Sequence, residues 1–171
     1  RIRSPGSGSG AMAEARIRPL GSSISVAGLV TAEAGRLGVP GLLVVEDTTG
    51  ALAIRLSEGS AGPPRGARVE LRGSLAAPYG QLELKVGAGG LRVAGVGALP
   101  APPTIRAAKV GEGTEARLVA IEGTVAATPR RSTTKDIAFD LVDPDGGRVR
   151  IMADASSRLT TTRRPSGDSA A

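Results

Sequence analysis

One strand–turn–strand pattern occurs twice in this sequence and limits the folds that the chain can adopt. Residues 42–56 read LLVVEDTTGALAIRL, and residues 137–151 read IAFDLVDPDGGRVRI. In both stretches apolar side chains recur at every second position, which places one face of each strand on a core. The segments DTTG and DPDGG are typical of tight turns, since Asp accepts local backbone hydrogen bonds and Gly tolerates a positive φ. Each stretch therefore predicts a β-hairpin.

Composition indicates a folded chain with an aliphatic core. Hydrophobic residues make up 40% of the 171 residues, and Tyr79 and Phe139 are the only aromatic ones. This length allows one domain or two small ones. The register of the second hairpin places Phe139 on the inward face, whereas Tyr79 lies in a turn, where it either packs or stacks on a ligand.

The residue types present argue against most catalytic and metal-binding chemistry. The chain contains no Cys and no His, which excludes disulfides, thiolate or imidazole metal sites and nucleophile–His pairs. Residues 143–154 resemble a calcium-binding loop only faintly, because Pro144, Gly147 and Arg148 stand where that loop needs other residues. We therefore expect a protein that is not an enzyme and has no cofactor.

The charge balance favours an anionic partner. The net charge is +6, from 22 basic and 16 acidic residues, and Arg far outnumbers Lys. Such a balance is typical of proteins that contact phosphate polymers or anionic surfaces. A GC-rich genome is the alternative explanation for an excess of Arg, Ala and Gly. Composition alone leaves both open.

The order of strand-like segments divides the chain into five parts. A strand over Ile24 to Val30 carries Gly28 in its middle, which predicts a bulge or bend that lets the strand serve two edges of a barrel. Strand patterns also cover Val69 with Leu71, Leu82 to Val86, and Leu91 to Val96. The expected parts are a flexible lead (1–19), a first barrel (20–96), a Pro/Ala-rich linker (97–115), a partial second unit (116–155) and a polar tail (156–171). The Gly/Ser-rich start suggests a segment of a longer protein, with neither a signal peptide nor a membrane span.

The second unit repeats the first but is shorter. The predicted strand Arg117 to Val125 has Gly123 in the place of Gly28, and the second hairpin follows. No counterpart of residues 69–73 or 81–86 comes after it. We therefore predict an all-β fold with tandem small five-stranded Greek-key barrels, the second incomplete.

Four segments together resemble a known family. Read in order, SVAGLVT (25–31), VEDTTG (45–50), AIRL (53–56) and RVELRG (68–73) are similar to bacterial OB-fold nucleic-acid-binding domains. Such domains are repeated in large surface or secreted proteins beside lamin-tail or nuclease domains. The resemblance covers residues 20–96 well and 117–153 in part. It implies a secreted or cell-surface protein whose partners are single-stranded nucleic acid and other domains of the same chain.

The resemblance also implies where a ligand binds. In OB folds the exposed face of the second and third strands and the adjoining loops contact the ligand. Carried onto this sequence, the interface comprises Arg36, Leu42, Val44, Arg55, Arg65, Arg68, Arg72, Tyr79, Arg130, Arg131, Lys135, Arg148 and Arg150. Arg55 and Arg150 are expected at corresponding outward positions.

Two functions follow from these patterns. The first is weak binding of single-stranded DNA or RNA without sequence specificity, by guanidinium groups that pair with phosphates. The second is a structural spacer or protein-interaction module in a multidomain protein. The arginines favour the first, and the lack of aromatic residues at the outward hairpin positions favours the second.

Overall fold

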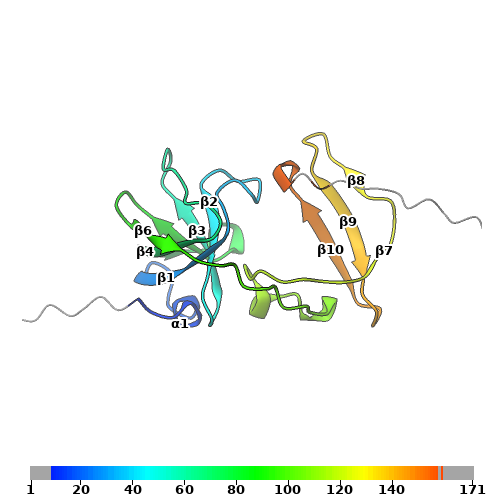
Figure 1. Ribbon diagram of the computed structural model, residues 1–171, viewed down its shortest axis with the longest axis horizontal. Coiled ribbons are helices and arrows are strands. Elements are labelled where there is room, and N and C mark those ends of the chain that lie inside the picture. The colour runs from blue at the N-terminus through cyan, green and yellow to red at the C-terminus, as the bar shows by residue number, and fades with distance from the viewer. Residues whose placement is uncertain (1–8, 158, 160–171) are drawn as a thin grey trace, which may run out of the picture.

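The protein is all-β, with a closed five-stranded barrel followed by a second, open sheet (Figure 1). This computed structural model describes residues 9–157 and 159. The barrel consists of strands β1 (Ser23–Ala32), β2 (Leu42–Glu46), β3 (Ala51–Leu56), β4 (Ala67–Ala76) and β5 (Glu83–Val86). The predicted all-β class with a small OB-like barrel is confirmed, and a second sheet follows the barrel. No helix among the described residues has the length and apolar character needed to cross a membrane.

Strand pairing closes the barrel in the order β1-β2-β3-β5-β4, and β4 returns to β1. Every pair is antiparallel except β3 with β5, an arrangement that makes the barrel OB-like. Because β1 pairs with β4 over residues 23–29 and with β2 over residues 29–32, one long strand serves two edges. The predicted bend is confirmed, and the register shift lies between Val30 and Ala32, just beyond Gly28.

Gly28 is required because two strands approach closely at this bend. A Cβ atom there would lie 2.7 Å from the backbone oxygen of Glu46 and 2.7 Å from Cγ1 of Val45. Every residue other than glycine carries that atom. Glycine therefore lets β1 cross β2 as the barrel closes.

The barrel core is aliphatic, and a short helix closes one end of it. Inward residues such as Leu43, Leu52, Ile54 and Leu84 are fully buried. Helix α1 (Met12–Arg16) adds Met12, whose side chain is also fully buried in this cluster. The sequence alone leaves residues 11–19 undecided between a helical turn and an extended lead-in, and the structure gives them a helix.

The remaining predicted segments of the first unit form as expected. Strand β6 (Leu91–Val96) pairs with the first half of β4, whereas β5 pairs with its last residues. The single-turn helix η1 (Pro78–Gly80) connects β4 to β5 at the expected turn. Residues 58–66 form a loop without regular structure.

The second sheet is built on the second predicted hairpin. Strands β9 (Ile137–Val142) and β10 (Arg148–Ala153) pair in antiparallel fashion, and the two-residue strands β7 (Thr124–Val125) and β8 (Arg130–Arg131) pair with β9. The predicted strand over residues 117–125 is wrong before Thr124. Residues 117 and 118 instead contact the first barrel, and Ala120 bridges to Thr104. Short helical turns occupy Ala107–Lys109 (η2), Glu112–Thr114 (η3) and Ala155–Ser157 (η4).

The two hairpin turns use similar hydrogen bonds, each centred on an aspartate. Asp47 Oδ1 accepts the backbone N–H groups of Thr49 and Gly50 at 2.7 and 2.8 Å, and its Oδ2 accepts that of Met12 at 2.9 Å. Asp143 Oδ1 accepts the N–H groups of residues 145 and 147 at 3.0 and 2.8 Å, and its Oδ2 accepts that of Ala107 at 2.8 Å. Each Asp therefore closes its turn and also holds the first residue of the helical segment that precedes its unit.

Candidate nucleic-acid interface

The outer face of β2 and β3, where the expected interface lies, is covered in this protein. Leu42 and Val44 point away from the barrel core, yet they are only 4% and 5% exposed, and Ala53 of β3 is equally buried. Leu42 and Val44 therefore offer no surface to a ligand, which corrects the expected interface. Segments later in the chain contact Glu46 at one end of this face and Arg36 at the other.

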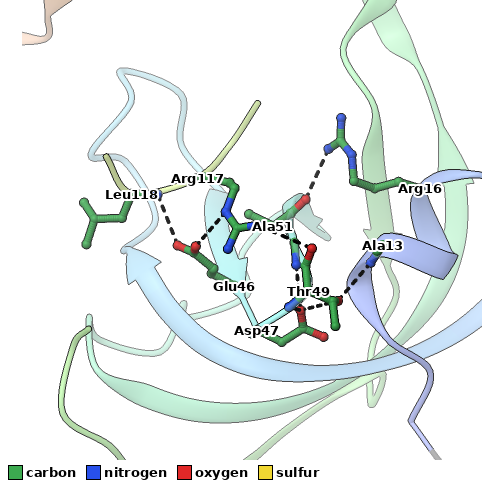
Figure 2. Close-up of polar contacts among 9 residues, drawn as sticks. Ala13, Arg16, Glu46, Asp47, Thr49, Ala51, Arg117 and Leu118 are labelled. Atoms are coloured by element: carbon green, nitrogen blue, oxygen red, sulfur yellow. Dashed lines mark hydrogen bonds and ion pairs between the residues drawn. The ribbon is translucent and has the colours of Figure 1, made fainter. Parts of the chain in front are cut away.

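At the turn end of the face, Glu46 binds the segment that follows the linker. Its Oε1 accepts a hydrogen bond from Nε of Arg117 at 3.1 Å, and its Oε2 accepts the backbone N–H of Leu118 at 3.1 Å (Figure 2). Arg16 of α1 contacts both the Ala51 carbonyl, at 3.1 Å, and the Glu115 carboxylate. These contacts hold residues 115–118 against the barrel.

At the other end, the loop before β2 contacts the segment after β10. The guanidinium of Arg36 donates to the carbonyl of Ser156 at 3.1 Å, and also pairs with Glu33, to which its Nε donates at 2.9 Å. Hydrogen bonds from the backbone and from Arg36 hold the pKa of Glu33 below its usual value despite partial burial. Arg36 is exposed but is already engaged by these partners.

Arg55 is paired inside the first barrel and is not a free cation. Its Nε and Nη2 atoms donate to the two carboxylate oxygens of Glu83 at 3.0 and 2.7 Å. The Arg55 side chain is 31% exposed and that of Glu83 only 3%. The hydrogen bonds from Arg55 to Glu83 raise the pKa of Arg55. This bidentate pair binds β3 to β5 and corrects the expectation that Arg55 projects freely toward a ligand.

Other expected residues of the first unit lie on the barrel surface away from β2. Arg68 and Arg72 are exposed on β4, and Arg65 is exposed in the loop before it. Within residues 9–157 and 159, none of the three forms an ion pair. Tyr79 is fully exposed in η1 with a φ of 59°, so a packing role is excluded and its ring is free to stack.

The second sheet gathers the arginines of the second hairpin on one surface. Arg148 and Arg150 alternate on β10 with 64% of each side chain exposed, and Arg150 lies opposite Asp140 of β9. Nε of Arg150 donates to Asp140 Oδ1 at 2.7 Å, and Nη1 of Arg148 lies 3.5 Å from Oδ2. Arg130 of β8 pairs with Ala138, two residues from Asp140 on the same side of β9. We call this set of Arg130, Asp140, Arg148 and Arg150 the basic face.

The arginines of the basic face all lower the pKa of Asp140. The hydrogen bond from Arg150 is the largest cause of the lowered pKa of Asp140, and the charges of Arg150, Arg148 and Arg130 add to it. Asp140 is therefore ionised at neutral pH. Arg148 and Arg150 contact the carboxylate and Arg130 lies on the same side of the sheet, so the basic face has a surplus of positive charge.

Two expected residues lie beside the basic face but not on it. Arg131 pairs with Ile137, whose register is that of the opposite side of the sheet. Lys135 occupies the loop before β9 with a φ of 71°, and its carbonyl accepts a hydrogen bond from Arg131 at 3.3 Å. Sequence reasoning missed Met152, which is 77% exposed and follows Arg148 and Arg150 at the same alternation on β10. The sequence signal for Met152 is the alternation of outward residues 148 and 150, which places residue 152 on the same side of β10.

A cavity against the outer face of β1 and β4 is a weaker candidate. Residues of the barrel, of the proline-rich segment 100–103 and of the 117–118 contact line it. Its carboxylates are already bound, since Glu46 holds Arg117 and Glu70 pairs with Arg92. Arg68 also lines this cavity, and it forms no ion pair within residues 9–157 and 159. The described residues contain no group of three or more potential ligand side chains placed to hold a metal ion.

Comparisons with known proteins add little. The sequence matches no protein-family model and no curated protein. A solved structure of the hypothetical protein ygiW from E. coli is similar over 52% of this chain and 92% of that chain, with 16% identity and a TM-score of 0.41. A likeness this distant carries no argument, so the assignment of the barrel depends on its own strand order and register.

Proposed function

We propose that this chain is a non-catalytic module that binds single-stranded nucleic acid weakly through the basic face of its second sheet. The observation that carries the proposal is that Arg130, Arg148 and Arg150 share one side of the second sheet with a single carboxylate, that of Asp140. A flat, exposed surface with surplus guanidinium groups fits a chain of phosphates.

The proposed binding is weak because one of the two usual driving terms is missing. Proteins that bind single strands combine a basic track with aromatic rings, and each stacked base contributes on the order of 1–3 kcal/mol. Tyr79 and Phe139 are the only aromatic residues, and neither is part of the basic face. Counterion release from phosphates then dominates, so we expect a micromolar or weaker dissociation constant that rises steeply with salt.

The proposal includes a relationship between the two units. We interpret the second sheet as a second, partial OB-like unit, supported by the matching roles of Asp47 and Asp143. Gly28 and Gly123 also match: a Cβ at Gly123 would lie 2.3 Å from the backbone oxygen of Val142, as one at Gly28 would meet that of Glu46. On this interpretation, the basic face is the ligand-binding face of the second unit. The equivalent face of the first unit is covered.

The covered face of β2 and β3 supports a second candidate function. If both units serve only to space other domains or to contact proteins, the first unit has no need of an open ligand face. The buried Leu42 and Val44 fit that role. The two functions differ in a simple observable, because a spacer does not bind oligonucleotides.

Binding of a labelled single-stranded oligonucleotide, measured by fluorescence anisotropy at low and at physiological salt, tests the proposal. We expect saturable binding at low salt that weakens strongly as salt rises. Absence of binding at low salt, or binding that salt leaves unchanged, would contradict the proposal and favour the spacer.

A further inference from the structure

A surface depression joins the two units beside the basic face. The loop before β2 contributes Arg36, Leu37 and Gly38, and the end of β10 contributes Met152 and Asp154. Met152 continues the outward alternation of Arg148 and Arg150, so the depression begins where the basic face ends. A strand rises about 3.3 Å per residue, which places Met152 about 6.6 Å along β10 from Arg150.

The depression has a mixed lining, in which the apolar side chains of Leu37 and Met152 are open to solvent beside Arg36, Asp136 and Asp154. Leu37 is 48% exposed and Met152 is 77% exposed. Large apolar groups left open beside a charged surface often mark a ligand-binding position. The thioether of Met152 and the isobutyl group of Leu37 both offer apolar contact, which suits the face of a nucleobase.

A carboxylate of fixed orientation lies in the depression. Asp154 Oδ1 accepts the backbone N–H of Ser156 at 2.8 Å, which holds the group in place. Its Oδ2 faces the loop at Gly38, where an added Cβ would lie 2.7 Å from that oxygen. Hydrogen bonds from the side chain and the backbone of Ser156 hold the pKa of Asp154 below its usual value. Among residues 9–157 and 159, the backbone hydrogen bond to Asp154 goes to Oδ1 and not to Oδ2. The neighbouring Asp136 accepts hydrogen bonds from Ala155 and Thr134.

We infer that this depression binds a nucleobase that carries an exocyclic amino group, while the adjoining phosphates lie on the basic face. A carboxylate accepts a hydrogen bond from such an amino group, as carboxylates do from N4 of cytosine. Thymine and uracil present a carbonyl oxygen at the same position, which an ionised carboxylate repels. The inference rests on the proposed function and adds a preference for amino bases, cytosine above all, over thymine.

The first test compares oligo(dC) with oligo(dT) of equal length at low salt. We expect wild-type protein to bind oligo(dC) about fivefold more tightly. Asp154→Asn removes the carboxylate and supplies a donor to thymine, so the preference should disappear even as the lost negative charge strengthens binding to both oligonucleotides. Glu58→Gln is the matched control, because it removes one exposed negative charge elsewhere. That variant should keep the preference.

The second test does not depend on a variant. The chain contains two methionines, of which Met12 is fully buried in the barrel core and Met152 is exposed in the depression. In a protein with labelled methionine methyl groups, oligo(dC) should shift the Met152 signal and leave that of Met12 unchanged.

The outcomes separate the two proposals. Equal binding of oligo(dC) and oligo(dT), or an unmoved Met152 signal during saturable binding, would overturn the base preference and leave the proposed function standing. A preference that survives Asp154→Asn would also overturn it. If neither oligonucleotide binds, the proposed function fails and this inference fails with it.

Discussion

The two hairpins have the same turn chemistry but opposite outer faces. Asp47 and Asp143 make equivalent hydrogen bonds, and both hairpins place apolar residues on one side. On the other side, β2 and β3 carry Leu42, Val44 and Ala53, all buried, whereas β10 carries two exposed arginines and β9 the half-buried Asp140. The outer side is therefore a packing surface in the first hairpin and a charged surface in the second.

This difference teaches that a ligand face cannot be assigned from the fold alone. In the closed barrel of the first unit, the outer face of β2 and β3 is buried, and its Glu46 contacts a later segment of the chain. The second sheet is open, and its charged side is the one that solvent reaches. The predictions below test whether the two copies share their architecture and differ in function as proposed.

The largest expected effect comes from the matched glycines. Gly28→Ala should lower the free energy of unfolding of the barrel by about 3 kcal/mol, because its Cβ overlaps a backbone oxygen that cannot move without opening the sheet. Gly123→Ala should loosen the second sheet and leave the barrel unchanged. Urea unfolding combined with amide exchange in each unit measures both. Loss of barrel protection in the Gly123 variant would show that the units do not fold separately.

The next largest effect is a difference in stability between variants of two outward arginines, Arg55 and Arg150. Arg55→Gln should cost about 2 kcal/mol of stability, because it leaves Glu83 buried without a partner; partial exposure of Arg55 keeps the cost below that of a fully buried pair. Arg150→Gln should leave the free energy of unfolding almost unchanged, because the Arg150–Asp140 pair is solvent-screened. Thermal unfolding of both variants decides this. Equal losses would mean that the two positions have the same role after all.

The turn aspartates predict a pH dependence. Burial of Asp47 acts to raise its pKa, but hydrogen bonds from Thr49, Met12 and Gly50 outweigh this and lower it below the usual value. The pKa of Asp143 is also lowered, chiefly by the hydrogen bond from the Ala107 backbone. A depressed folded-state pKa stabilises the protein above the unfolded-state pKa, and this contribution disappears as the pH falls through the folded-state pKa.

Asp47→Asn should therefore destabilise the barrel by roughly 1.5 kcal/mol at neutral pH, since an amide nitrogen cannot accept the Met12 N–H. The difference from wild type should shrink as the pH falls below about 4, where the wild-type carboxyl begins to take up its proton. Urea unfolding across this pH range measures it. A difference that stays constant with pH would contradict the role given to the ionised carboxylate.

Much of the fold could be predicted from the sequence, because it depends on local patterns. Alternation around Leu43 and Ile54 determines which residues enter the barrel, and turn residues determine where strands reverse. The bend at Gly28 follows from the same reasoning. The helix at residues 12–16 is too short for a clear pattern, and burial of Met12 and the Asp47 cap stabilise it.

The interface was harder to predict because the polar contacts of the β2 face are made with residues far along the chain. Glu46 meets Arg117 and Leu118 across about seventy residues, and no local pattern signals that contact. The same contact explains why residues 117–121 are not a strand. Arg55 and Arg150 look alike in sequence, but one has Glu83 beside it on a parallel strand and the other has Asp140 across a hairpin.

The most direct test of the account compares two pairs of exposed arginines. The first double variant, Arg148→Gln/Arg150→Gln, removes two positive charges from the basic face. The second, Arg68→Gln/Arg72→Gln, removes two positive charges from the barrel surface. Amide exchange in β9 verifies that the hairpin stays folded. Oligonucleotide binding at low salt should weaken about fivefold, or about 1 kcal/mol, in the first variant, and markedly less in the second. Equal weakening in both would show that bulk charge alone attracts the ligand, and would contradict a binding site on the second sheet.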